Sequence, residues 1–201
     1  MKKYKTLIIS LLLSSSIVLI FSSCDKSRKL TSEEITDLNY LREEEKLARD
    51  VYLFLYDLYQ DDVFLNISKA EQKHMDKMLK LLDTYDLPDP ASNERGAFNN
   101  VELQTLYNQL IVQSDSSLIE ALKVGATIED VDLFDIRAFI NRAERKDILN
   151  TYDKLDCGSE NHMRAFSARL SELGYQYQPQ YISQTEYNAI LATESGGCGK
   201  K

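Results

Sequence analysis

ISKAEQKHMDKMLKLLDTY, residues 67–85, is the stretch that decides the fold class. Its residues at steps of three and four fall on one side of an α-helix, which repeats every 3.6 residues. That stripe consists of Ile67, Glu71, His74, Met78, Leu81 and Tyr85. Glu71 and His74 are its acid–base members, and they stand among apolar residues. The stretch therefore predicts an amphipathic helix that directs a carboxylate and an imidazole toward a core.

The same stretch allows a second interpretation of Glu71. Ser68 and Glu71 have the spacing of a capping box, in which a serine begins a helix and a glutamate three residues later closes the first turn. A helix that begins there leaves Glu71 in an exposed first turn, where its carboxylate needs no metal. The pattern alone leaves both interpretations open.

An earlier predicted helix begins at another capping box, formed by Thr31 and Glu34. Its inward stripe reads Ile35, Leu38, Leu41, Glu45, Ala48, Tyr52, Leu55 and Tyr59. Glu45 interrupts this apolar face much as Glu71 interrupts its own. Glu44 also has apolar residues at helical spacing, so periodicity leaves the choice between Glu44 and Glu45 open.

After a turn-rich loop at 86–100, a short connecting helix is predicted for residues 101–112. A third long helix is predicted for residues 118–143. Its stripe reads Leu118, Ala121, Gly125, Glu129, Asp132, Ile136, Phe139 and Ala143. Glu129 and Asp132 therefore place two acids one turn apart in the middle of an inward face.

Gly125 is costly in the interior of this helix by about 1 kcal/mol, which predicts close packing or a kink. Asp130 and Asp135 fall off the inward stripe. We expect these two side chains to be solvated.

A fourth long helix is predicted for residues 146–173, with Gly174 as its stop. Its stripe reads Ile148, Tyr152, Leu155, Ser159, His162, Phe166, Arg169 and Leu173. A lone histidine in such a setting is more often a hydrogen-bonded core residue than a ligand. Here, however, two inward histidines occur together with four inward acids, which favours the interpretation that the histidines are metal ligands. No part of the chain has the pattern of a strand, so the predicted fold class is all-α.

The inward acids need counter-charges, because burying an unpaired ionised carboxylate costs several kcal/mol. The chain has two histidines in all, which favours a metal centre. The predicted ligands are Glu45, Glu71, His74, Glu129, Asp132 and His162. Their four carboxylates are balanced by two divalent cations, and oxygen and nitrogen ligands suit iron or manganese, with zinc as an alternative.

The N-terminal region predicts export. Three lysines precede an apolar run at 7–21, and residues 1–23 are typical of a signal peptide. Cys24 resembles the lipidated cysteine of bacterial lipoproteins, which predicts a lipid-anchored protein of the cell envelope; an uncleaved anchor or a plain signal peptide is the alternative. Removing the three lysines changes the formal net charge from −8 to −11. That charge argues against nucleic acid or anionic lipid as a partner.

The remaining predicted divisions are a linker at 24–30, the helical domain at 31–173 and a tail at 174–201. The tail is rich in tyrosine and has a capping box at Ser183 and Glu186, which predicts a short helix packed on the domain. Cys157 and Cys198 are either a disulfide, which an exported compartment permits, or two free thiols.

Three motifs carry a resemblance to known families. Glu45-Lys-Leu-Ala-Arg-Asp-Val-Tyr52, Glu71-x-x-His74 and Gly125 before Glu129-x-x-Asp132 resemble the ligand helices of the rubrerythrin branch of the ferritin-like superfamily. An exported ferritin-like family of unknown function is resembled by Arg49-Asp-Val-Tyr52, by Gly125 with Glu129 and Asp132, and by Gly158-Ser-Glu-Asn-His162. The resemblance implies a ferritin-like four-helix bundle with a short connecting helix between its second and third helices. It also implies that the predicted ligands bind a di-iron centre, that Tyr52 is a catalytic residue beside it, and that peroxide or dioxygen reacts there.

Two departures from the rubrerythrin pattern matter. The fourth helix has Ser159 where a glutamate stands three residues before the histidine, which puts one bridging carboxylate in doubt and leaves a single ion or a carboxylate such as Asp132 as alternatives. No paired Cys-x-x-Cys module is present, so an electron donor must be separate. The competing functions are a non-catalytic helical envelope lipoprotein that acts as an interaction or scaffold module, and a storage cage. A homodimer is predicted by analogy alone.

Overall fold

A computed structural model describes residues 29–198, which form six α-helices and no strand. The helices are α1 (Ser32–Tyr59), α2 (Asp62–Thr84), α3 (Val101–Ser114), α4 (Leu118–Ile140), α5 (Lys146–Glu172) and α6 (Gln184–Leu191). The all-α prediction is confirmed for this part of the chain. None of these helices is long and apolar enough to cross a membrane. The predicted signal peptide and Cys24 lie outside the described residues.

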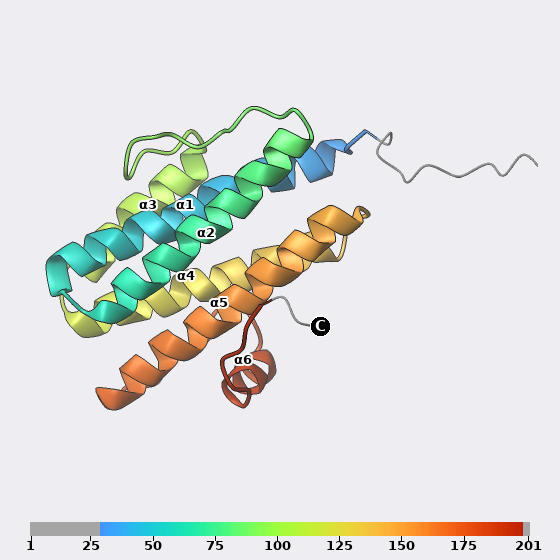
Figure 1. Cartoon of the computed structure of the whole chain (residues 1–201). Helices are drawn as coiled ribbons and strands as arrows, with labels where there is room; N and C mark the ends of the chain where they lie inside the picture. The colour runs from blue at the N-terminus through green and yellow to red at the C-terminus, as the bar shows by residue number, and fades with distance from the viewer. Residues whose placement is uncertain (1–28, 199–201) are drawn as a thin grey trace, which may run out of the picture.

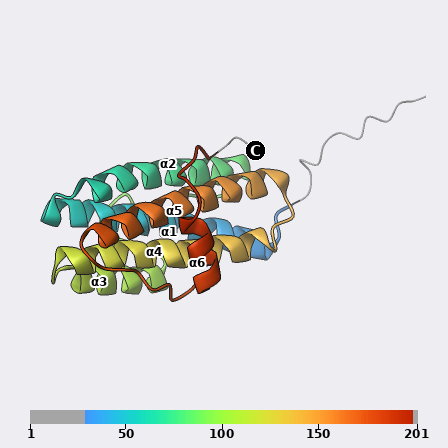
Figure 2. The ribbon, with the colours of Figure 1, turned by 90° about the horizontal axis from the view of Figure 1, so that it is seen from below.

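The four long helices α1, α2, α4 and α5 lie side by side (Figure 1). The most extensive packing joins α1 to α2 and α4 to α5, and further contacts of α2 with α5 and of α1 with α4 close the arrangement. The connecting helix α3 lies against α1 and α4. Figure 2 shows α6 on the outside, across the α4 and α5 side.

Two hydrophobic clusters fill the interior at different levels along the long helices. One contains Leu38, Leu41, Met78, Leu82, Ile148, Tyr152 and Leu155. The other contains Val51, Leu55, Phe64, Ile67, Met163, Phe166 and Leu170. On α1, α2 and α5 the predicted ligands fall between these two sets in sequence. The titratable groups therefore occupy a layer with apolar packing at both ends.

The predicted start of α1 is confirmed, because the Thr31 side chain and Glu34 form the capping box. The predicted start of α2 is wrong by five residues. The helix begins at Asp62 because the Asp61 side chain caps it by accepting from the amide of Val63 at 3.2 Å. Ser68 lies inside the helix and donates to the carbonyl of Leu65. The interpretation of Glu71 as an exposed first-turn residue is therefore wrong.

Two glycines in and after the helices have the roles that the pattern predicted. A Cβ on Gly125 would lie 2.5 Å from the ring of Phe166, so the glycine permits close packing of α4 on α5. Gly174 follows α5 with a φ of +80°, a left-handed conformation that favours glycine at a helix end.

The expectation of solvated acids on α4 is wrong for Asp130 and only partly met by Asp135. Asp130 is fully buried and accepts from the Ile182 amide at 2.8 Å and the Tyr177 hydroxyl at 2.8 Å. It thereby holds the tail onto α4. Asp135 is partly buried. Neither interaction is visible in helix periodicity, because the donors to Asp130 come from a segment some 50 residues later.

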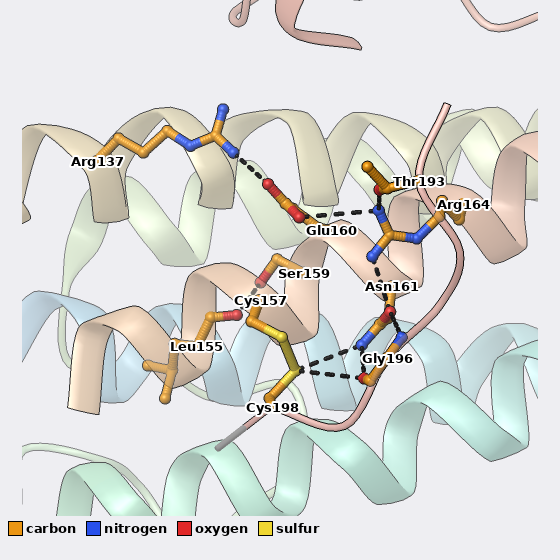
Figure 3. Close-up of a disulfide and its surroundings, with 10 residues drawn as sticks. All are labelled: Arg137, Leu155, Cys157, Ser159, Glu160, Asn161, Arg164, Thr193, Gly196 and Cys198. Carbon is orange, nitrogen blue, oxygen red and sulfur yellow. Dashed lines mark hydrogen bonds and ion pairs between the residues drawn. A yellow bond between two sulfur atoms is a disulfide. The ribbon is translucent and has the colours of Figure 1, made fainter. Parts of the chain in front are cut away.

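The tail is attached to α5 by a disulfide between Cys157 and Cys198, with a Cα–Cα distance of 5.6 Å (Figure 3). Near it, the Asn161 side chain donates to the carbonyl of Gly196 at 3.0 Å, and Arg164 donates to the Thr193 hydroxyl. The short helix predicted in the tail is α6, and Ser183 and Glu186 form its capping box. The last part of the described chain is thus fixed beside the residues of α5 that face the site.

Candidate metal centre

The six predicted ligands come from four helices and are all buried. Glu45 lies on α1, Glu71 and His74 on α2, Glu129 and Asp132 on α4, and His162 on α5. Their exposed fractions range from 1% for Glu45 and Glu129 to 7% for His162. Each side chain is therefore removed from bulk water, and its charge must be balanced inside the protein.

Glu71 is the centre of the cluster because its two oxygens contact both histidines. Its Oε2 lies 2.9 Å from Nδ1 of His74, and its Oε1 lies 2.7 Å from Nδ1 of His162. The ring centroids of the two histidines are 5.5 Å apart. One carboxylate therefore stands between two imidazoles that α2 and α5 bring together.

Two groups of potential ligands share this carboxylate. In the first, Oε2 of Glu45 lies 3.2 Å from Nδ1 of His74. In the second, Oε2 of Glu129 lies 3.4 Å from Nδ1 of His162. Within each group one ligand atom per residue lies within 4.8 Å of the others. Ligands about 2.1 Å from one ion are about 3.0–3.4 Å apart in octahedral or tetrahedral geometry, and the printed distances of 2.7–3.4 Å are close to this range, so each group could hold an ion.

Buried polar atoms without hydrogen-bond partners in the cluster also fit metal ligands. Nδ1 of His162 approaches Glu71 closely but has no aligned hydrogen-bond partner. Oε1 of Glu45 and Oδ1 of Asp132 are buried and accept no hydrogen bond. Buried polar atoms without partners are costly, and a cation coordinated by them removes that cost.

Asp132 lies beside the two groups but belongs to neither of them. Its Oδ2 accepts a short hydrogen bond from the Ser159 hydroxyl. The serine that departs from the Glu-x-x-His pattern therefore holds the carboxylate of a neighbouring helix. The structure thus assembles five of the predicted ligands closely and places the sixth at their edge, on the α5 side.

The cluster perturbs its own protonation equilibria. Burial raises the pKa of Glu45 to about 7, against the opposing effect of His74. Burial also raises the pKa of Glu129, and it raises the pKa of Asp132 well above the usual range with the help of the other carboxylates. For Glu71, burial acts upward, but His162 and His74 outweigh it and hold the pKa below its usual range. Without metal the cluster must therefore hold protons, which a metal ion would displace.

Tyr52 is fully buried and donates to Oε1 of Glu129 at 2.5 Å. A second, longer contact of 3.3 Å joins its hydroxyl to the carbonyl of Gly125. Burial raises the pKa of Tyr52 well above its usual value, so the hydroxyl stays protonated and remains a donor. In the structure Tyr52 orients a potential ligand, and its assignment as a catalytic residue stays a prediction.

Glu45, and not Glu44, faces His74. Glu44 is also buried, with an exposed fraction of 4%, but it borders a small cavity with residues of α3 and α4. The two neighbours therefore serve different parts of the interior, a distinction that their nearly equal periodicity could not make.

Gly158 is a site residue that helix periodicity did not identify. A Cβ on Gly158 would lie 2.4 Å from Nε2 of His74, so only a glycine leaves room for this imidazole between α2 and α5. A glycine in the interior of a predicted helix was the available signal, and it has the same meaning at Gly125. The backbone of α5 thus limits how His74 can be placed.

The sequence matches the family described as an uncharacterized protein domain (DUF2202) over residues 34–194. The uncharacterized protein MJ0754 of Methanocaldococcus jannaschii is 46% identical over 167 residues, which are 83% of this chain and 90% of that protein. The crystal structure of hypothetical protein MJ0754 from Methanococcus jannaschii has a TM-score of 0.83 at 45% identity and covers 84% of this chain and 97% of that chain. These likenesses confirm the predicted membership of a family of unknown function, and neither name states a ligand or a reaction.

Proposed function

The chain belongs to the DUF2202 family of uncharacterized domains, and we propose that it is a ferritin-like metalloprotein that binds two iron or manganese ions and reacts with peroxide or dioxygen. The observation that carries this proposal is the position of Glu71. Its two oxygens contact His74 and His162, and each histidine has a second carboxylate beside it. Such an arrangement suits a carboxylate that bridges two ions.

Charge supports two ions over one. Glu45, Glu71, Glu129 and Asp132 contribute four negative charges when ionised, and neutral imidazoles contribute none. Two divalent cations balance this set, whereas one cation leaves two buried negative charges. Iron and manganese suit ligands of this kind, and zinc is the alternative that ligand chemistry allows.

The order of the helices supports a ferritin-like four-helix bundle formed by α1, α2, α4 and α5. Di-iron carboxylate bundles place a glutamate on two helices and a Glu-x-x-His step on the other two. Here α1 provides Glu45, α4 provides Glu129 and α2 provides the full step. On α5 the step is reduced to Ser159-x-x-His162, and Ser159 holds Asp132 by a hydrogen bond. Asp132 is therefore the candidate for the missing carboxylate.

The chain's own residues would prepare the centre in three ways. Glu71 would hold the two ions near each other, Tyr52 would orient Glu129 by hydrogen bonding, and the apolar clusters above and below would exclude water. Two bound iron or manganese ions would supply the electrons that reduce peroxide or dioxygen. A separate donor of unknown identity would then restore the reduced state.

We also propose that the protein is exported and lipid-anchored at Cys24 in the bacterial cell envelope. The disulfide between Cys157 and Cys198 supports an oxidising compartment, because disulfides persist there and are rare in the cytosol. The small oxidant would reach the domain outside the cytoplasm, and a homodimer remains a proposal by analogy.

Ser159 favours one alternative, a non-catalytic scaffold module that keeps the fold without a stable pair of ions. Metal content distinguishes the two functions. Protein lacking residues 1–24 would be reconstituted anaerobically with Fe(II), desalted and analysed by inductively coupled plasma mass spectrometry, beside His74→Ala, His162→Ala and the control Asp83→Asn, whose side chain is exposed on α2. About two ions per chain, lost sharply in both histidine variants and kept in the control, is the expected result. About one ion per chain would limit the proposal to a mononuclear centre. Folded protein that holds no stoichiometric amount of metal would overturn the proposal.

A further inference from the structure

A second cavity lies between α5 and the tail, apart from the metal centre. Its walls are formed by residues of α5 between 164 and 171 and by residues of the tail between 176 and 195, which include most of α6. Its volume is about 520 Å³, and small-molecule sites commonly have volumes of about 300–1,000 Å³. None of the six predicted metal ligands is among its lining residues. This tail cavity is therefore a candidate site for a ligand of its own.

Hydrogen bonds hold the tail against α5, so the two walls of the cavity are fixed relative to each other. Arg164 of α5 donates to the carbonyl of Ile190 at 2.9 Å and to the Thr193 hydroxyl at 2.8 Å (Figure 3). The Tyr187 hydroxyl of α6 donates to the Ser167 hydroxyl of α5 at 2.9 Å. The disulfide described above ties the end of the tail to α5. A preformed cavity of this kind loses little conformational entropy when a ligand binds.

The lining of the tail cavity has no acid, and its one cation is already bound within the protein. Arg164 is the only charged residue among the thirteen that line the cavity. Besides its bonds to the tail, its guanidinium donates to Oδ1 of Asn161 at 2.8 Å and lies 3.7 Å from Oε2 of Glu160. An ionic ligand would lose water without finding a free counter-charge. The cavity therefore favours an uncharged ligand.

Amides and hydroxyls make up most of the remaining lining. Four side-chain amides border the cavity, together with four serine or threonine hydroxyls; the amides belong to Gln176, Gln178, Gln184 and Asn188. Each amide has two donor hydrogens and an acceptor oxygen, and each hydroxyl both donates and accepts. Gln176, Gln178 and Asn188 are exposed, so their side chains can reach a ligand in the cavity. The matching ligand is one that donates and accepts hydrogen bonds at many positions.

We propose that the tail cavity binds a short, uncharged oligosaccharide. The hydroxyl groups of sugars both donate and accept, as the amides and hydroxyls of the lining do. The C–H faces of sugar rings are apolar, and Tyr177, Tyr187 and Leu191 provide apolar surface in the same cavity. The rings of the two tyrosines adjoin each other, with their centroids 6.0 Å apart. A wholly apolar ligand fits less well, because it would remove water from the amides without replacing their hydrogen bonds.

The ligand could be a free oligosaccharide or a segment of an envelope polysaccharide, because the same hydrogen bonds recognise both. The cavity shares no residue with the metal centre. The inference therefore goes beyond the proposed function and does not depend on it. His74→Ala, which removes a predicted metal ligand on α2, should leave sugar binding unchanged.

The test is a titration followed by two-dimensional amide NMR, with triacetylchitotriose, cellotriose and maltotriose as the probes. The protein lacks residues 1–24 and keeps every residue that the structure describes. At least one trimer should cause saturable shifts confined to amides around the tail cavity. Gln178→Ala and Asn188→Ala should each weaken its binding about fivefold, the effect of one lost hydrogen bond. Asn150→Ala, which removes an exposed amide of α5 outside the cavity, should keep the wild-type affinity.

Ala168→Trp fills the cavity from an exposed position on α5, so it should fold and lose binding. Circular dichroism with thermal unfolding checks that each variant is folded. The proposal is overturned if no trimer gives saturable shifts at low millimolar concentration, if the shifts lie elsewhere, or if Ala168→Trp binds as the wild type does. Retention of the protein on the insoluble polymer of the sugar that binds would identify a polysaccharide as the source. Binding of the trimer alone would identify a free oligosaccharide.

Discussion

Glu71→Gln is the substitution that most directly tests a shared ligand. The side chain keeps its shape but loses the charge that lies 2.9 Å from His74 and 2.7 Å from His162. Because Glu71 belongs to both ligand groups, its loss should lower the affinity for both ions. Glu45→Gln changes only the group that contains His74, so it should lower the affinity for one ion.

The magnitude follows from linkage between binding and folding. With free metal at 100 times the Kd, each bound ion stabilises the folded state by about 2.7 kcal/mol. Loss of a supporting residue around a metal typically costs up to about 100-fold in affinity, and a direct ligand should cost at least that much. At the same metal concentration each weakened site then contributes only about 0.4 kcal/mol. For a domain of this size, the rise in Tm on metal addition should fall from roughly 15 °C to roughly 2 °C in Glu71→Gln.

Thermal unfolding monitored by circular dichroism, with and without Mn²⁺ or anaerobic Fe(II), measures this difference. Glu45→Gln should keep about half of the wild-type rise in Tm, and Asp83→Asn on the same helix should keep all of it. Metal analysis of the same samples gives the stoichiometry. If Glu71→Gln retained one tightly bound ion and behaved as Glu45→Gln does, Glu71 would not be shared and the dinuclear interpretation would be wrong.

Three further predictions concern the surroundings of the cluster. Gly158→Ala should displace His74, because the new Cβ meets Nε2 at 2.4 Å, and should lower both the free energy of unfolding, by about 1–3 kcal/mol, and metal content, measured by urea unfolding and metal analysis; normal metal content would contradict it. Cys157→Ser should lower the free energy of unfolding by about 4 kcal/mol in the chain-entropy account of a loop of 41 residues, while metal stoichiometry stays unchanged. In metal-free protein, burial lowers the pKa of His74, but Glu45 and Glu71 outweigh it and raise the pKa to about 9. A proton must therefore be displaced below that pH, so metal affinity should increase as pH rises from 6 to 8, and a pH-independent Kd in competition titrations would refute this.

Much of the cluster was predictable because its residues obey helical spacing. His74, Glu129 and His162 each stand on an apolar stripe, and burial of one face of a helix follows from such a stripe with little dependence on the rest of the fold. The helix ends were predictable where a local cap exists, as at Thr31 and Ser183. Local rules therefore account for which faces turn inward.

Most of the features that could not be predicted depend on partners distant in sequence. Asp130 is off-stripe, yet it is buried because amides of the tail donate to it. Cys157 and Cys198 pair because the tail returns to α5, a geometry that their spacing does not contain. The early start of α2 had a local cause in Asp61, but the stronger apolar pattern from Ile67 onward concealed it.

The relation of Ser159 to Asp132 bears on the symmetry of the proposed centre. A glutamate at position 159 would provide a second carboxylate for the proposed pair of ions, beside the first that we propose for Glu71. The serine instead donates to Oδ2 of Asp132, while Oδ1 has no partner. One carboxylate oxygen of α4 is thereby fixed, and the other is left free to bind. In the proposed centre, Oδ1 of Asp132 would therefore be the oxygen directed to an ion, while Ser159 holds Oδ2 in place. A centre of this kind should hold its two ions with unequal affinity, since the ion nearer Asp132 gains a ligand that the other lacks.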